Sequence, residues 1–130
     1  LAPSDWIRTF GATAGDPNGS RLKLWANASA RNPGGKSEIG YWGMELARHL
    51  VEMYAVPICI LNGAVGGSRI DQHLRNPARP LDTTTHYGRL LRRVTDARLT
   101  HGVRAIFWYQ GENDQGAEDV SHVNTPWFES

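Results

Sequence analysis

Two short apolar runs in the second half of the chain end abruptly in glycine and polar residues. The first, Val56–Leu61, leads into Asn62, and the second, Val103–Tyr109, leads into Gln110. Continuous apolar runs of this length, rich in β-branched and aromatic residues, are typical of strands covered on both faces, as in a parallel sheet. We therefore expect two buried strands, each with polar residues at its carboxyl end.

Helical spacing of apolar residues appears twice. Between Gly40 and Tyr54 the stripe consists of Gly43, Leu46, Ala47, Leu50, Val51 and Tyr54, and Ser37 is the expected N-cap. The second stripe follows the capping segment Asp82–Thr85 and consists of Tyr87, Leu90, Leu91, Val94 and Ala97. This second helix lies between the two strands, which predicts a right-handed βαβ unit whose parallel strands share one carboxyl edge.

Shorter elements are expected on either side of the first helix. Trp6–Phe10 and Arg21–Trp25 alternate in polarity around the turn formers of Gly15–Gly19, a pattern that predicts a hairpin or a pair of short strands. One or two helical turns are expected over Arg69–Leu74, before Pro77 ends them.

The two strand ends carry the residues that chemistry would use. Gln110, Glu112, Asn113 and Asp114 follow the second run, and Gly63, Gly66 and Gly67 precede Ser68 after the first. In open α/β sheets the carboxyl ends of the strands hold the ligand crevice, and glycines let the backbone approach a ligand closely. The alternative for the polar group is an ordinary turn after a buried strand.

Composition narrows the class of protein without identifying it. The 130 residues allow one domain, and 40% apolar and 21% charged residues describe an ordinary globular chain without a membrane span. A formal charge of +1 argues against a nucleic-acid or membrane partner, although Arg89, Arg92 and Arg93 cluster on what we expect to be a solvated helix face. The single cysteine, Cys59, excludes an internal disulfide and is expected to be a small buried hydrophobe.

Taken together, the two junctions resemble the SGNH (GDSL-type) hydrolase superfamily, in its sialate O-acetylesterase-like carbohydrate esterase branch. Asn62–Ser68 matches the branch's Asn-x-Ala-x-Gly-Gly-Ser/Thr turn, and Trp108–Glu112 matches its Trp-Tyr-Gln-Gly-Glu block. The segment Gly40–Tyr54 also looks like the helix that precedes the turn in this branch. The resemblance covers roughly residues 5 to 115.

The resemblance implies a flavodoxin-like three-layer α/β/α fold with a parallel sheet, incomplete in this chain. It also implies hydrolysis of acetylated carbohydrates or other small esters by a serine, with no cofactor. Gly66 would offer its backbone N–H and Asn113 its side-chain amide to the oxyanion, as the wider superfamily's Gly-x-Asn-Asp block suggests. Gly67, Ser68, Gln110 and Glu112 would bind substrate or hold the loops. Carbohydrate ester substrates favour an extracellular or periplasmic location.

The family's nucleophilic serine and its late Asp-x-x-His pair have no convincing match here. The chain begins with Leu1 and ends at Ser130 without a closing helix, so we interpret residues 1–130 as one partial domain of a longer protein. Asp119 and His122 have the right mutual spacing but lie too close behind Asn113 for the intervening elements of that fold, and we interpret them as coincidence.

The sequence also argues against a nucleophilic Ser68, a metal site and a nucleotide-binding module. Ser68 lacks the last glycine of a nucleophile elbow, and Asp71 with His73 lacks a third metal ligand, so no metal is expected. A nucleotide-binding module would need the Gly-x-Gly-x-x-Gly or P-loop pattern, which the glycine turn does not have. A non-catalytic carbohydrate-binding domain that retains the crevice stays open as the alternative function.

Overall fold

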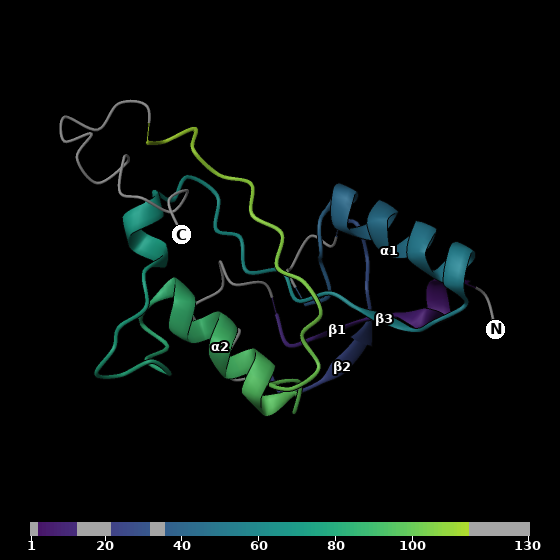
Figure 1. Ribbon diagram of the computed structural model, residues 1–130, viewed down its shortest axis with the longest axis horizontal. Helices are drawn as coiled ribbons and strands as arrows, with labels where there is room; N and C mark the ends of the chain where they lie inside the picture. Colours follow the sequence, from purple (N-terminus) through teal and green to yellow (C-terminus); the bar gives the residue numbers. More distant parts are fainter. Residues whose placement is uncertain (1–2, 13–21, 32–35, 115–130) are drawn as a thin grey trace.

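The computed structural model describes residues 3–12, 22–31 and 36–114. The described elements are η1 (Pro3–Trp6), β1 (Ile7–Phe10), β2 (Trp25–Asn27), α1 (Tyr41–Tyr54), β3 (Ile58–Cys59), η3 (Ile70–His73) and α2 (His86–Asp96). In the view of Figure 1 the strands lie between α1 and α2. No helix in these ranges is long and apolar enough to cross a membrane.

The described strands form a mixed sheet with the order β2-β1-β3. β1 pairs antiparallel with β2, with Arg8 opposite Asn27, and parallel with β3, with Ile7 opposite Ile58. The α/β class is therefore confirmed, and the N-terminal pairing is confirmed with a shift, because β2 spans Trp25–Asn27 rather than Arg21–Trp25. The expected turn at 15–19 lies outside the described residues. The predicted parallel sheet holds for β1 and β3 but not for β2, which runs antiparallel beside β1. The flavodoxin-like arrangement stays a prediction.

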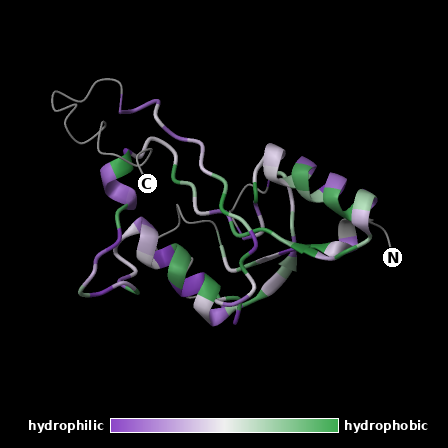
Figure 2. Cartoon of the chain, in the orientation of Figure 1, coloured by the Kyte–Doolittle hydropathy of each residue, from purple (hydrophilic) through white to green (hydrophobic). Residues whose placement is uncertain are grey.

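The core lies between α1 and the sheet. Gly43, Ala47 and Val51 are the buried residues of α1, and they recur at four-residue spacing. Ala47 and Val51 pack with Ile7, Ala28 and Ile39 in one cluster. Figure 2 shows hydrophilic and hydrophobic residues alternating along both helices, and along α1 this is the pattern of a helix with one covered apolar face. Burial of small and β-branched residues here lets α1 approach β1 and β3 closely.

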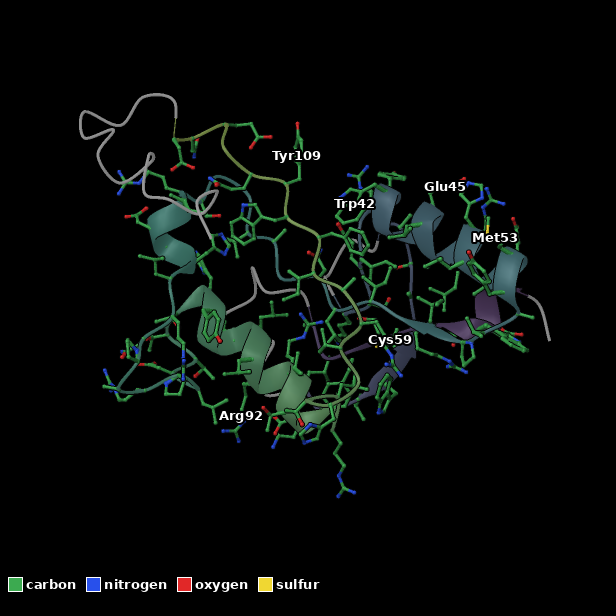
Figure 3. The ribbon with its side chains drawn as sticks, in the orientation of Figure 1. Trp42, Glu45, Met53, Cys59, Arg92 and Tyr109 are labelled. Carbon is green, nitrogen blue, oxygen red and sulfur yellow. The ribbon has the colours of Figure 1, made fainter. Side chains whose placement is uncertain are left out.

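The predicted strand at 103–109 does not form. The segment is irregular, and Ile106 and Tyr109 are 84% and 87% exposed. Figure 3 shows Tyr109 pointing away from the rest of the protein, while the Phe107 ring meets the Trp42 ring of α1 edge-on at 6.0 Å between centroids. An apolar run becomes a strand only where a neighbouring strand pairs with its backbone, and no described strand does so. The expected βαβ unit is therefore wrong for the part of the chain described.

Three smaller expectations about α1 and β3 also fail. α1 is capped by Gly40, at φ 81°, rather than by Ser37. Tyr54, expected in the buried stripe, is 61% exposed at the last position of the helix. Cys59 is exposed because successive residues of a strand face opposite sides, and Ile58 takes the side toward α1.

α2 confirms the local prediction at its start and corrects the assignment of its faces. Thr85 is the N-cap, and its hydroxyl accepts a hydrogen bond from the Gly88 N–H at 3.0 Å. The short η3 helix over Ile70–His73 also lies where one or two turns were expected. Arg89 and Arg93, however, are 7% and 3% exposed, so the expected solvated arginine face is wrong for both. Arg89, Arg93 and Ala97 recur every fourth residue and form the buried side of the helix.

Gly88 and Gly43 occupy the same position, the third residue, of α2 and α1 and provide a matched pair of substitutions. A Cβ at Gly88 would lie 2.0 Å from the Asp82 carbonyl oxygen and 2.8 Å from Thr85 Oγ1. At Gly43 the nearest atoms would be 3.9 Å away. We expect Gly88→Ala to destabilise the protein by about 2 to 3 kcal/mol through displacement of the cap, and Gly43→Ala to be neutral or stabilising by up to about 1 kcal/mol. Urea unfolding followed by circular dichroism measures both, and equal stabilities would contradict the described capping geometry.

Candidate active site

The first junction is a compact turn from Asn62 to Ser68. The Asn62 side-chain oxygen accepts the Ala64 N–H at 2.9 Å, and the Ser68 N–H donates to the Val65 carbonyl at 3.2 Å. Gly67 has a φ of +75°, which a residue with a side chain rarely adopts. A Cβ on Gly66 would meet nothing within 4 Å, and Gly66 is exposed. The turn thus presents bare backbone at Gly66.

A buried arginine fixes the start of this turn. Arg93 Nε donates to the Phe10 carbonyl at 2.9 Å, and its Nη1 donates to the Asn62 carbonyl at 2.8 Å. Burial lowers the pKa of Arg93 to about 10, against the opposing influence of Cys59, so the guanidinium remains charged at neutral pH. Since Phe10 ends β1, Arg93 joins the end of that strand to the residue that begins the turn.

The second junction folds back onto the first. Asn113 Nδ2 donates a hydrogen bond to the Gly67 carbonyl, and Gln110 Nε2 donates to the Ser68 carbonyl at 3.3 Å. Asp114 Oδ1 accepts the Ile70 N–H at 3.1 Å. These partners lie 42 to 46 residues apart in the sequence, so side chains at three positions hold the two junctions together even though no strand precedes the second.

The residues proposed from the sequence take different positions. Asn113, Gln110, Gly67 and Ser68 lie in this network, and Gly66 precedes the glycine that Asn113 contacts. Glu112 is exposed and makes no hydrogen bond within the described residues. Sequence reasoning placed Asp114 among the polar residues of the expected crevice without a specific role; it is 7% exposed and its side chain bonds to the other loop. The sequence feature that could have identified Asp114 is its position immediately after Asn113 in the Gly-Glu-Asn-Asp block.

A second missed residue is His73, at the end of η3. Its Nε2 lies 2.7 Å from Ser68 Oγ, and its ring packs against the rings of His86 and Trp108 at centroid distances of 5.0 and 5.2 Å. Burial lowers the pKa of His73, and the charge of Asp114 opposes that shift. The neutral imidazole therefore prevails at neutral pH. The five-residue step from Ser68 to His73 gave no sequence signal, because the contact depends on the short helix between them.

The Ser68 hydroxyl is oriented by the turn itself. Ser68 Oγ donates to the Val65 carbonyl at 2.6 Å, which directs its hydrogen to that oxygen. With the hydroxyl hydrogen on that carbonyl, the contact with His73 requires the imidazole tautomer that carries a hydrogen on Nε2. A general base must instead accept the hydroxyl hydrogen. This geometry ties Ser68 and His73 to the structure of the turn.

The described residues offer no metal centre. Asp71 is exposed and pairs with Arg69 at 2.7 Å, which lowers the pKa of Asp71. No group of three histidine, cysteine or acidic side chains in 3–12, 22–31 and 36–114 lies close enough to hold a metal. Asp119 and His122 lie outside the described residues. The two junctions bring together hydrogen-bond donors, among them the Asn113 amide, and Gln110 and Asp114 form hydrogen bonds from one loop to the other.

These donors, on an α/β scaffold, suit an ester hydrolase, and comparison with known families supports that class. The chain matches the family of carbohydrate esterases described as sialic acid-specific acetylesterases over residues 24–125. The chain belongs to this family, which confirms the resemblance to the sialate O-acetylesterase-like branch. No curated protein and no solved structure gives a significant match. Membership implies an esterase lineage and acetylated carbohydrate substrates.

Proposed function

We propose that this chain supplies the oxyanion-binding part of a carbohydrate O-acetylesterase whose nucleophilic serine lies outside residues 1–130. The Gly66 N–H and the Asn113 amide would donate hydrogen bonds to the oxygen of the acetyl carbonyl as the serine attacks. The observation that carries the proposal is the contact between Asn113 Nδ2 and the carbonyl of Gly67, the residue that follows the exposed Gly66.

The chemistry of an amide suits this role. Its nitrogen carries two hydrogens, and the contact with Gly67 uses one of them, which leaves the second for a substrate oxygen. An amide donates without a charge that must be desolvated, and fixed donors of this kind stabilise the developing oxyanion in ester hydrolysis. Gln110 would support the loop, and Gly67, Ser68 and Glu112 would border the substrate.

The contact between Ser68 and His73 favours a second candidate, in which Ser68 itself is the nucleophile. Because the Ser68 hydroxyl hydrogen points to the Val65 carbonyl, this candidate requires the hydroxyl to rotate and the imidazole to change tautomer. We favour the external serine, since it leaves the described hydrogen bonds intact. The two candidates differ in whether the isolated chain can hydrolyse an ester.

The isolated 130 residues are expected to hydrolyse aryl acetates no faster than buffer does, because they contribute oxyanion donors without an activated nucleophile. The measurement is the release of 4-nitrophenol from 4-nitrophenyl acetate by chain whose circular dichroism shows it to be folded. Turnover that disappears in Ser68→Ala and His73→Ala would establish the second candidate instead.

A carbohydrate-binding domain without catalysis is the remaining alternative. It predicts that a longer protein containing this chain and the family's serine binds an acetylated sugar, such as an O-acetylated sialic acid, without releasing acetate. The proposal predicts acetate release that is lost when that serine becomes alanine. Titration calorimetry together with an acetate assay distinguishes the two.

A further inference from the structure

Asp114 is a buried carboxylate to which neither the family match nor the oxyanion argument gives a role. Only 7% of the residue is exposed, and within the described residues no Lys, Arg or His nitrogen forms an ion pair with it. The guanidinium of Arg69 makes its side-chain hydrogen bonds with Asp71 instead, and these bonds raise its pKa, with a smaller contribution from the charge of Asp114. A buried carboxylate is costly unless hydrogen bonds satisfy it, so its neighbours must supply donors.

Both oxygens of Asp114 accept hydrogen bonds, and the donors come from different loops. Oδ1 accepts the Ile70 N–H at 3.1 Å, at the first residue of η3. Oδ2 accepts Gln110 Nε2, and the same nitrogen also donates to the Ser68 carbonyl. The Asp114 N–H closes its own turn on the Gly111 carbonyl at 3.1 Å. Asp114 therefore joins the loop of Asn113 to the end of the glycine turn.

This link bears directly on Asn113, its neighbour in the chain. With the run at 103–109 outside the described sheet, the second loop depends on side-chain contacts to stay beside the first. Asn113 itself is exposed, and within the described ranges its side chain forms one hydrogen bond, to the Gly67 carbonyl. A hydrogen-bond donor is effective in catalysis only when its position is fixed before the charge develops.

We propose that Asp114 is a positioning residue, which clasps the two loops together so that the Asn113 amide stays beside Gly66. The inference rests on the proposed oxyanion role of Asn113 and extends it to a residue that does not touch the substrate. Asp114 acts through Asn113, and its removal lets the amide move away from the developing oxyanion.

The first test is a double-mutant cycle in the longer protein that contains this chain and the nucleophile. Asp114→Ala is expected to lower kcat about 10- to 100-fold with little change in KM, as for a small misplacement of a catalytic group. Because Asp114 acts through Asn113, Asp114→Ala combined with Asn113→Ala should lose no more than Asn113→Ala alone. The proposal would be overturned if Asp114→Ala retained wild-type kcat. It would also be overturned if the fold-loss of kcat in the double variant equalled the product of the two single losses.

The second test does not depend on esterase activity. Asp114→Ala removes the acceptor of the Ile70 N–H, so hydrogen exchange at Ile70 should accelerate at least tenfold, while the amides of α1 keep their protection. Glu52→Ala, which removes an exposed carboxylate on α1, is the control and should leave Ile70 unchanged. Unchanged hydrogen exchange at Ile70 would show that Asp114 does not hold the two loops together. If hydrogen exchange at Ile70 accelerates in a protein that has no esterase activity, the proposed function is wrong, but Asp114 still holds the two loops together.

Discussion

Replacement of Asn113 by alanine is expected to lower kcat for an O-acetylated sugar by about 10²- to 10³-fold, with KM nearly unchanged. The loss corresponds to about 3 to 4 kcal/mol, the usual effect of removing one oxyanion donor. KM changes little because the hydrogen bond strengthens mainly as negative charge develops in the transition state. Steady-state kinetics of the proposed longer protein, which would include the nucleophile, provides the measurement.

Asn113→Asp should be at least as damaging as Asn113→Ala. A carboxylate has no hydrogen to donate near neutral pH, and its charge repels both the oxyanion and the Gly67 carbonyl that the amide contacts. Asn27→Ala, on the exposed strand β2, is the matched control and should retain full turnover. If both Asn113 variants fold and retain wild-type kcat, Asn113 is a turn residue without a catalytic role.

Arg93→Met should be among the most destabilising single changes in the chain, at about 2 to 4 kcal/mol. Methionine retains much of the side-chain volume but leaves the Phe10 and Asn62 carbonyls without their charged donor. Part of the gain from these bonds is offset by the burial that lowers the pKa of the guanidinium, so the net loss is smaller than two full charged hydrogen bonds.

Arg92→Met is the control for this prediction. Arg92, labelled in Figure 3, lies next to Arg93 on α2, but its side chain is 41% exposed and pairs with Asp96 at 3.2 Å. Exposed pairs of this kind contribute about 0 to 1 kcal/mol. Urea unfolding of both variants, followed by circular dichroism, measures the difference. Equal stabilities would mean that Arg93 does not hold the glycine turn to β1.

Local patterns in the sequence predicted the elements that depend on neighbours in the chain. The Thr85 cap, the turn at η3 and the helix ending at Tyr54 all follow from capping and proline signals within a few residues. The N-terminal pairing also followed from short-range alternation, although β2 begins only at Trp25. Such features form wherever the chain supplies the necessary donors and spacing.

The predictions that were wrong concern features that depend on which other parts of the folded chain pack against a segment. The run at 103–109 has the composition of a buried strand, but composition cannot provide the partner strand that its backbone needs. Arg93 was placed in solvent because arginine is mostly exposed, yet the carbonyls of Phe10 and Asn62 satisfy it inside. Residues far apart in the sequence supply these partners.

The candidate site also combines features that local sequence predicts with features that depend on residues far apart in the sequence. The motifs indicated which residues carry hydrogen-bonding groups, and Asn113 with the glycine turn could be proposed from the sequence. The contact of Asn113 with Gly67 and the role of Asp114 as acceptor for Ile70 depend on how two loops pack, which no local pattern encodes. For that reason His73 and Asp114 emerged only from the geometry.

The most direct test of the oxyanion role is a crystal structure of the longer protein after reaction with diethyl 4-nitrophenyl phosphate. The serine oxygen forms a bond to phosphorus and 4-nitrophenolate leaves, so the diethylphosphoryl-serine adduct holds its phosphoryl oxygen where the oxyanion would lie. Our account predicts that this oxygen lies about 2.7 to 3.1 Å from Asn113 Nδ2 and from the Gly66 backbone nitrogen. An adduct whose phosphoryl oxygen is bound by other donors, with Asn113 and Gly66 beyond hydrogen-bonding distance, would contradict it.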